Sequence, residues 1–242
     1  MQTPKIDKDF KVTIVIPVHN EEEIIVHNVT SIVERVGKIK DLSWEILLVE
    51  NGSTDRTLEL IKEMGSKEAR IKYIVSEVAN YGAALQTGFI AADGDIIVSF
   101  DIDYWDIKFL EVAAYVMQVR YDIIIASKNL LLSKDRRSFL RKCASMVFRY
   151  ILFFVFGLRV TDTHGIKAWR NNSKLKQIFK DSYPAHHTYD TEIIVRAMHQ
   201  DCEVLEVPVE VIENRTNDRS IVKRVPKALK ELYSMHQRLK LK

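Results

Sequence analysis

Residues 80–103 read NYGAALQTGFIAADGDIIVSFDID and predict a helix followed by a buried strand. Gly82–Ala92 is rich in glycine and alanine, which favours a helix that lies close against a sheet. Asp95–Phe100 (DIIVSF) is a short apolar, β-branched run, which is typical of a strand covered on both faces. An Asp-x-Asp pair, Asp101 and Asp103, comes directly after that strand.

Similar units lie on either side of this segment. The expected helices start after Asn20, acting as a cap, and after Ser53 or Thr54; the first continues to about Val36. Further strands are expected at Val12–Pro17, Trp44–Val49, Ile71–Val75, Asp122–Ala126 and Cys202–Val211, with helices at Phe109–Val119, Arg136–Leu158 and Tyr189–His199. Alternation of strand and helix predicts an α/β fold with a mainly parallel central sheet flanked by helices.

The composition favours a globular protein. Of 242 residues, 47% are hydrophobic and 29% charged, and the net charge is only +3, which does not favour a polyanion partner. Cys143 and Cys202 have no metal-ligand spacing, so a reduced, intracellular protein is expected. The charged N-terminus does not resemble a signal peptide. Because Arg149 interrupts the longest apolar stretch, Met146–Leu158, no membrane span is expected.

Polar residues gather where three of the expected strands end. These clusters are His19-Asn20-Glu21, Glu50-Asn51-Gly52-Ser53 and Asp101-Ile102-Asp103. Ligands of such sheets bind beyond the carboxyl ends of the strands. The sequence therefore predicts one ligand site built from all three clusters.

Asp101 and Asp103 are the candidate metal ligands. In an extended chain, side chains two residues apart point the same way, so the two carboxylates would converge. A divalent cation with hard oxygen ligands fits such a pair and would neutralise the charge of a bound diphosphate. The alternative interpretation is a solvated acidic loop.

Glu50, Asn51 and Ser53 are candidates for contacts with a nucleobase or ribose, because amides and carboxylates form specific hydrogen bonds. Gly52 would permit a tight turn. An ordinary turn and helix cap explains the same residues equally well.

Lys128, Arg141 and Ser145 are candidates for a phosphate site. Arg141 and Ser145 are four residues apart and would share one helix face, and a guanidinium beside a hydroxyl suits a phosphate. The alternative is a solvated basic face. Asp162 precedes a turn and could act as a general base or orient the acceptor; the alternative is a cap.

Met146–Leu158 (MVFRYILFFVFGL) is either a core helix or an interfacial helix that dips into lipid. The basic, partly apolar residues 221–242 form a plausible amphipathic anchor for anionic lipid. Nucleic acid is not expected as a partner, because no aromatic-and-basic recognition motif accompanies the charge. We expect an N-terminal extension at 1–10, one catalytic domain at 11–220 and this tail.

Six segments in order resemble the family-2 glycosyltransferases with a GT-A fold, and most closely the dolichyl-phosphate or polyprenyl-phosphate mannose and glucose synthases. They are IPVHNEE (16–22), ENGSTDRT (50–57), residues 80–103, RKCAS (141–145), TDTHGIKAWR (161–170) and EVPVEVIENR (206–215). Three positions depart from the family pattern. Glu50-Asn51 replaces an Asp-Asp pair, Tyr104-Trp105-Asp106 replaces a Leu-Gln or Leu-Ser type, and a glycine is missing after Arg215.

The resemblance implies site residues. A nucleotide-sugar site would comprise Pro17, His19, Asn20, Glu21, Glu50, Asn51, Ser53, Asn80, Gly82, Asp101 and Ile102. An acceptor-phosphate site would comprise Lys128, Arg141, Ser145 and Arg215. Catalytic roles would fall to Asp101, Asp103, Asp162 and Arg141, with Mg²⁺ or Mn²⁺ on Asp101 and Asp103 and Trp105 nearby.

The implied reaction is inverting transfer of a hexose, from a donor of the GDP-mannose or UDP-glucose type, to dolichyl or polyprenyl phosphate. It would take place at the cytoplasmic face of a membrane, in a pathway of protein glycosylation, with room for a membrane-anchored partner subunit. One alternative is a saccharide hydroxyl as acceptor, for which Asp162 or Asp190 would be the base. The other is a non-catalytic nucleotide-binding subunit.

Overall fold

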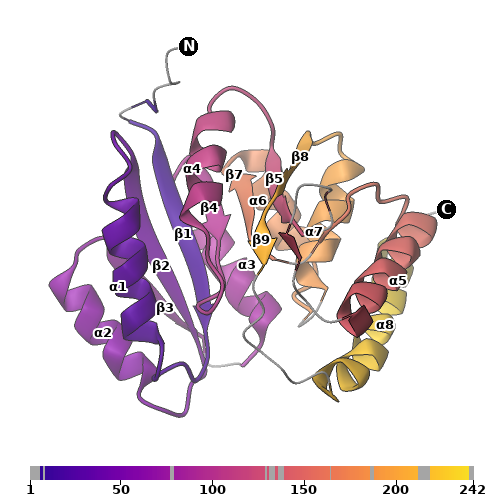
Figure 1. Ribbon diagram of the computed structural model, residues 1–242, viewed down its shortest axis with the longest axis horizontal. Helices are drawn as coiled ribbons and strands as arrows, with labels where there is room; N and C mark the ends of the chain where they lie inside the picture. Colours follow the sequence, from indigo (N-terminus) through magenta and orange to yellow (C-terminus); the bar gives the residue numbers. More distant parts are fainter. Residues whose placement is uncertain are drawn as a thin grey trace.

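The computed structural model describes residues 6–7, 9–76, 79–128, 130, 134–135, 139–163, 165–185, 188–211 and 219–239. Within these ranges, the side chains at 134–135, 139–141, 144, 210–211 and 219–225 are not described. Three layers make up the fold: one central sheet with helices on both faces (Figure 1).

The central sheet has seven strands in the order β3-β2-β1-β4-β7-β5-β8. Their bounds are β1 Lys11–Val18, β2 Ser43–Asn51, β3 Ile71–Ser76, β4 Ile96–Ser99, β5 Ile123–Ser127, β7 Lys167–Arg170 and β8 Val204–Pro208. All pairings are parallel except those of β7, which runs antiparallel between β4 and β5. Two short strands, β6 Lys134–Asp135 and β9 Glu210–Val211, form a separate parallel pair. The predicted α/β class and mainly parallel sheet are confirmed.

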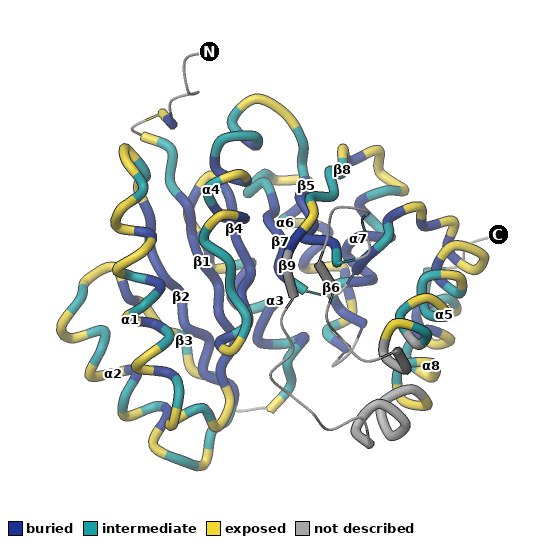
Figure 2. The backbone as a smooth tube through the Cα atoms, viewed as in Figure 1, coloured by how far each residue is buried: buried dark blue, intermediate teal, exposed yellow. Residues whose placement is uncertain are grey.

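Each face of the sheet has its own hydrophobic core. On one face, β1 and β2 residues such as Ile14 and Ile46 pack with α1 Ile25–Val36, α2 Thr57–Lys67 and α4 Ile107–Val116. On the other face, Val15 and Leu47 pack with α3 Tyr81–Ala91, α6 Ser173–Asp181 and α7 Tyr189–Met198. Figure 2 shows the inner strands β1, β4, β5 and β7 and their neighbour β2 buried along most of their length, as expected for strands covered on both sides, whereas the edge strands β3 and β8 are only partly buried.

The small residues of α3 allow the helix to lie close against the sheet, as the sequence predicts. A Cβ atom at Gly88 would collide with the side chain of Val15 in β1, and one at Gly82 would collide with the carbonyl of Ala185. These two glycines let α3 lie directly on β1 and bring its first turn against the segment before α7. The start of α3 is therefore fixed at the edge of the sheet that carries the polar clusters.

Two predicted helix starts are wrong. α1 begins at Ile25 and α2 at Thr57, and neither has a side-chain cap. Asn20 is not a cap because it takes a left-handed backbone conformation (φ 55°) and its Oδ1 accepts from the backbone N–H of Thr54 at 2.8 Å. Ser53 is not a cap because its hydroxyl accepts from the backbone N–H of Asn20 at 3.0 Å. These polar side chains join two loops.

The last two long helices pack on each other. α5, Phe139–Phe156, and α8, Arg219–Leu239, lie side by side at the far end of the molecule from α1 and α2 (Figure 1). Leu152 of α5 and Met235 of α8 are buried in the core that α3 and α7 share. None of the helices that the structure describes is both long and apolar enough to cross a bilayer.

Candidate functional site

The three predicted polar clusters lie at one edge of the central sheet. β2, β1, β4 and β5 all end at this edge, and the antiparallel β7 begins there. Read across the edge, the order is Glu50-Asn51, then His19-Asn20, then the Asp101 turn, then Lys167, then Lys128. The candidate site is this row of strand ends.

The loops after β1 and β2 are joined by direct hydrogen bonds. The His19 ring nitrogen Nδ1 lies 2.8 Å from the carbonyl oxygen of Asn51, and Asn20 binds both Ser53 and Thr54. Glu21 donates its backbone N–H to the hydroxyl of Thr57 at 2.8 Å. The predicted nucleotide residues in these two loops therefore form one hydrogen-bonded surface, although several of their polar atoms bind one another.

Glu50 and Asn51 are almost fully buried and support this surface. Glu50 accepts from the backbone N–H of Ser53, within the turn for which Gly52 supplies a positive φ of 69°. The side-chain oxygen of Asn51 accepts from the backbone N–H of Asn80 at 2.9 Å. The Glu50 contact matches the turn interpretation of this segment.

Asn80 and Gly82 bring the first turn of α3 into the site. Asn80 caps α3 by accepting from the backbone N–H of Ala83 at 3.2 Å, and its amide donates to the carbonyl of Pro184 at 3.0 Å. Tyr81 lies between them, and its hydroxyl donates to Oδ1 of Asp101 at 2.8 Å. Tyr81 is a site residue that the sequence reasoning missed; the only signal was its place beside two residues of the nucleotide set.

Asp101 and Asp103 meet through a turn, not through an extended chain. β4 ends at Ser99, and two backbone hydrogen bonds of 3.1 Å between Asp101 and Tyr104 close the turn. Burial raises the pKa of Asp101, and the charges of Asp103 and Asp190 raise it further. The hydrogen bond from Tyr81 and the charge of Lys167 oppose that rise in pKa. The charge of Asp103 thus acts on Asp101 within a tight turn, not along the extended chain that the sequence prediction assumed.

This crowding of negative charge fits a divalent cation, because a cation would relieve the repulsion that raises the Asp101 pKa. Within the described ranges no group of three or more His, Cys, Asp and Glu side chains could hold a metal ion. If a divalent cation binds at this turn, Asp101 and Asp103 would supply two oxygen ligands. The remaining ligands would come from water or a phosphate-bearing ligand.

A buried ion pair lies beside Asp101. Lys167, at the start of β7, is fully buried, and its ammonium donates to Asp190 at 2.7 Å and to the carbonyl of Gly165 at 2.6 Å. The other carboxylate oxygen of Asp190, Oδ1, is buried with no hydrogen-bond partner among the residues that the structure describes. Sequence reasoning missed Lys167, because nothing in TDTHGIKAWR predicts that this lysine faces inward.

Lys128 and Asp162 form a second ion pair at the end of β5. Their charged atoms are 2.8 Å apart, and both side chains are largely buried. Glu206 of β8 accepts from the backbone N–H groups of Thr161 and Asp162, which fixes this loop. Lys128, predicted to bind phosphate, and Asp162, predicted to be a base or cap, are therefore direct partners.

The remaining predicted residues fall into three groups. Pro17 and Ile102 are buried, in β1 and in the Asp101 turn. The indole of Trp105 points to α1, where its Nε1 donates to Asn28 at 3.1 Å and Arg35 lies over the ring. Arg141 and Ser145 lie in the first half of α5; the Arg141 side chain and all of Arg215 lie outside the described residues.

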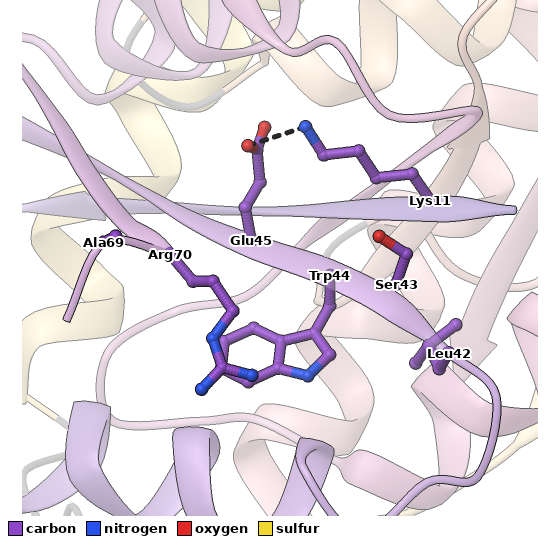
Figure 3. Close-up of a pocket in the computed structure, with 7 residues that line it drawn as sticks. All are labelled: Lys11, Leu42, Ser43, Trp44, Glu45, Ala69 and Arg70. Carbon is purple, nitrogen blue, oxygen red and sulfur yellow. Dashed lines mark ion pairs between the residues drawn. The ribbon is translucent and has the colours of Figure 1, made fainter. Parts of the chain in front are cut away.

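A cavity of about 370 Å³ lies at the opposite edge of the sheet, where β1 and β2 begin (Figure 3). Its walls include Trp44, with Arg70 stacked on the ring, and Glu45, which pairs with Lys11 at 2.8 Å. Glu45 also pairs with Lys72 at 2.7 Å, so its charge is already neutralised. We therefore assign this cavity no part in the site.

Comparison with known sequences identifies one family. The profile of Glycosyl transferase family 2 matches residues 13–179. Dolichyl-phosphate beta-glucosyltransferase ALG5D of Trichomonas vaginalis is 26% identical over 219 residues, covering 82% of this chain and 65% of that protein. The chain thus spans about 65% of the length of this relative. Undecaprenyl-phosphate 4-deoxy-4-formamido-L-arabinose transferase of Pectobacterium carotovorum is 37% identical over 103 residues, covering 40% of this chain and 30% of that protein.

Solved structures share the fold. Glucosyl-3-phosphoglycerate synthase from Mycobacterium tuberculosis, solved with uridine diphosphate, is similar with a TM-score of 0.63 and 17% identity, covering 94% of this chain and 76% of that one. Mannosyltransferase PcManGT from Pyrobaculum calidifontis, solved with GDP-Man and Mn²⁺, has a TM-score of 0.58 and 18% identity. The match covers 88% of this chain and 60% of that one.

Proposed function

The chain belongs to glycosyl transferase family 2 and has the GT-A fold, and from this premise we propose that it transfers a hexose from a nucleotide-sugar to a polyprenyl phosphate. One observation carries the proposal. The Asp101 turn lies on the sheet edge between the joined loops of β1 and β2 on one side and the Lys128–Asp162 pair on the other. The relatives named for dolichyl phosphate and undecaprenyl phosphate support the choice of acceptor.

The donor would lie over the loops of β1 and β2. His19, Asn20, Ser53 and the start of α3 would line its nucleoside, and the diphosphate would reach Asp101 and Asp103. When bound there, a divalent cation neutralises the charge that develops on the leaving diphosphate. Mn²⁺ is the ion in the similar mannosyltransferase structure, and Mg²⁺ offers the same hard-ligand chemistry.

The acceptor phosphate would lie at Lys128, with Arg141, Ser145 and Arg215 as further ligands. In the proposed step, a phosphate oxygen attacks the anomeric carbon and the bond from that carbon to the nucleoside diphosphate breaks. The configuration at the anomeric carbon is thereby inverted. A phosphate oxygen is already anionic near neutral pH, so the step needs positioning and charge neutralisation, not a strong base. The proposed step therefore does not need Asp162 as a base, which agrees with the ion pair between its carboxylate and Lys128.

A hydroxyl acceptor is the second candidate, because one observation favours it. Within the described ranges, Oδ1 of Asp190 is buried without a hydrogen-bond partner, and the negative charge of Asp190 raises the pKa of Asp101. Asp190 is itself paired with Lys167 through Oδ2, so Oδ1 is the oxygen that would receive the proton of a hydroxyl nucleophile.

An acceptor comparison separates the two candidates. We expect the chain, with Mn²⁺ and either UDP-glucose or GDP-mannose, to glycosylate dolichyl phosphate about 1000-fold faster than dolichol, because a site built for a polar group rejects an analogue that lacks it. Radiolabelled sugar extracted into organic solvent measures both rates. Equal rates for the two lipids, or transfer only to a soluble saccharide, would refute the phosphate acceptor.

We also propose that α5 lies on the surface of the membrane that holds the lipid-linked acceptor, at its cytoplasmic face. One side of α5 packs in the core through Leu152 and Phe156. The opposite side exposes five large apolar residues at helical spacing: Met146, Val147, Tyr150, Phe153 and Phe154. Lys142 is exposed on the same helix, and Arg149 lies over the ring of Tyr150. An aromatic apolar face with basic neighbours is typical of interfacial helices.

Vesicle binding tests this membrane surface. Changing Phe153→Ser and Phe154→Ser together should weaken binding to phosphatidylglycerol vesicles roughly 100-fold, because each phenylalanine contributes about 1.5–3 kcal/mol when it leaves water. Co-sedimentation measures the bound fraction. The control is Val119→Ser, which changes an apolar residue that is 87% exposed after α4. Equal binding by the double variant and the wild type would exclude α5 as the membrane contact.

A further inference from the structure

The side chain of Tyr81 joins the first turn of α3 to the Asp101 turn. Its hydroxyl donates to Oδ1 of Asp101 at 2.8 Å, and none of the other side chains that the structure describes hydrogen-bonds this carboxylate. A phenylalanine at this position would keep the ring but leave the carboxylate without its donor. What the hydroxyl adds is therefore a direct, fixed contact with one of the two candidate metal ligands.

Both ends of this hydrogen bond are held in place by the backbone. On the helix side, Asn80 caps α3, and Gly82 packs so closely against the carbonyl of Ala185 that an added Cβ atom would collide with it. On the other side, two backbone hydrogen bonds of 3.1 Å between Asp101 and Tyr104 close the turn. The hydroxyl and the carboxylate therefore meet between two parts of the chain that are each fixed independently.

A carboxylate held through one oxygen has its other oxygen restricted as well, because the group is planar. Oδ2 of Asp101 makes no hydrogen bond within the described ranges and stays available to a ligand. A tyrosine hydroxyl is a neutral donor, so it orients the carboxylate without adding a positive charge that would compete with a cation. The ammonium of Lys167, in contrast, is bound to Asp190 at 2.7 Å.

We infer that Tyr81 is a positioning residue, which orients Asp101 so that its second oxygen binds the divalent cation of the donor complex. This inference rests on the proposed function, since it concerns the same cation and diphosphate. Hydrogen bonds that orient metal-binding carboxylates are worth about 10–100-fold in metal affinity. Tyr81 acts through Asp101 and not on the sugar, so its loss should appear in metal binding and not in the maximal rate.

The variant Tyr81→Phe tests this role by a measurement that does not depend on turnover. Mn²⁺ is titrated into protein saturated with UDP, and the electron paramagnetic resonance signal of unbound Mn²⁺ gives the Kd. We expect the Kd for Mn²⁺ to rise about 10–100-fold, because the carboxylate is no longer oriented before the ion binds. In transfer assays the Mn²⁺ concentration for half-maximal rate should rise by the same factor, while kcat at saturating Mn²⁺ returns close to the wild-type value.

The matched control is Tyr189→Phe in α7. It also removes a tyrosine hydroxyl from a buried hydrogen bond, since Tyr189 donates to the carbonyl of Phe179 at 3.0 Å, but that bond does not involve Asp101. Its Kd for Mn²⁺ should equal that of the wild type. An equal rise in the two variants would assign the effect to a loosened core and overturn the inference.

Two further outcomes separate Tyr81 from the proposed function. If wild type and Tyr81→Phe bind Mn²⁺ equally well in the presence of UDP, the metal assignment stands and the role of Tyr81 is rejected. If the wild type with UDP binds no Mn²⁺, the metal assignment itself is wrong, and the inference falls with it.

Discussion

Asp101→Asn is expected to reduce sugar transfer by at least about 1000-fold while leaving the fold intact. The carboxylate would bind the cation that neutralises the leaving diphosphate, and a loss of several kcal/mol of charge stabilisation corresponds to this factor. Asparagine keeps an oxygen that can accept from the Tyr81 hydroxyl, and it removes a negative charge from beside Asp103 and Asp190. Initial rates over a Mn²⁺ titration, together with thermal unfolding, measure the two effects.

A matched control lies in the next turn of the chain. Asp106 caps α4 by accepting from the backbone N–H groups of Lys108 at 2.8 Å and Phe109 at 3.2 Å. Asparagine is an equally good cap, so Asp106→Asn should change neither the transfer rate nor the unfolding temperature. Full turnover by Asp101→Asn in saturating Mn²⁺ would remove the metal assignment and the proposed chemistry with it.

Lys167→Met is expected to lower the free energy of unfolding by about 3–5 kcal/mol, because removing one partner leaves a buried charge uncompensated. Lys167 is fully buried and Asp190 is only 15% exposed, so water cannot replace the lost ammonium. Without Lys167, Asp190 would keep an unpaired negative charge near Asp101, whose pKa that charge already raises. Urea denaturation measures the change.

Two further variants test this explanation. Adding Asp190→Asn to Lys167→Met should recover a large part of the loss, since the uncompensated charge disappears. Lys67→Met breaks a 2.6 Å pair with Glu63 on the surface of α2, where both side chains are more than half exposed, and should cost no more than about 1 kcal/mol. Equal losses for the buried and the surface lysine would show that burial of the pair does not matter.

The buried strands β1, β4 and β5 could be predicted because each is a nearly continuous apolar run that is covered on both faces. β3 lies at the edge of the sheet and is only partly buried. Predicted and observed bounds of β1 and β3 differ by a residue or less at each end. β7 could not be predicted, because KAWR is only four residues long and has a charge at each end. It becomes a strand because β4 and β5 pair with it from both sides, and those partners are distant in sequence.

The site was likewise predictable in its position on the sheet but not in its contacts between distant loops. Because ligands of parallel sheets bind beyond the carboxyl ends of the strands, the sequence predicted that the residues near His19, Glu50 and Asp101 share one edge of the sheet. The structure places all three at that edge. Pairings between loops could not be predicted, because they depend on distant backbone atoms. Asn20 and Ser53 look like caps in the sequence, yet they bind each other across 33 residues. The Lys128–Asp162 pair likewise joins two residues that the sequence assigned to separate roles.

The central position of β7 also sets the order in which the chain can fold. β1, β2, β3 and β4 are complete by Ser99, and they can pair as soon as that half of the chain has been synthesised. β4 then keeps one edge unpaired until Lys167–Arg170 arrives, 68 residues further on, and an open strand edge promotes misassembly. A nascent chain released before Arg170 would therefore hold the joined loops of β1 and β2 but be prone to aggregation, and the half of the sheet proposed to receive the acceptor would close last.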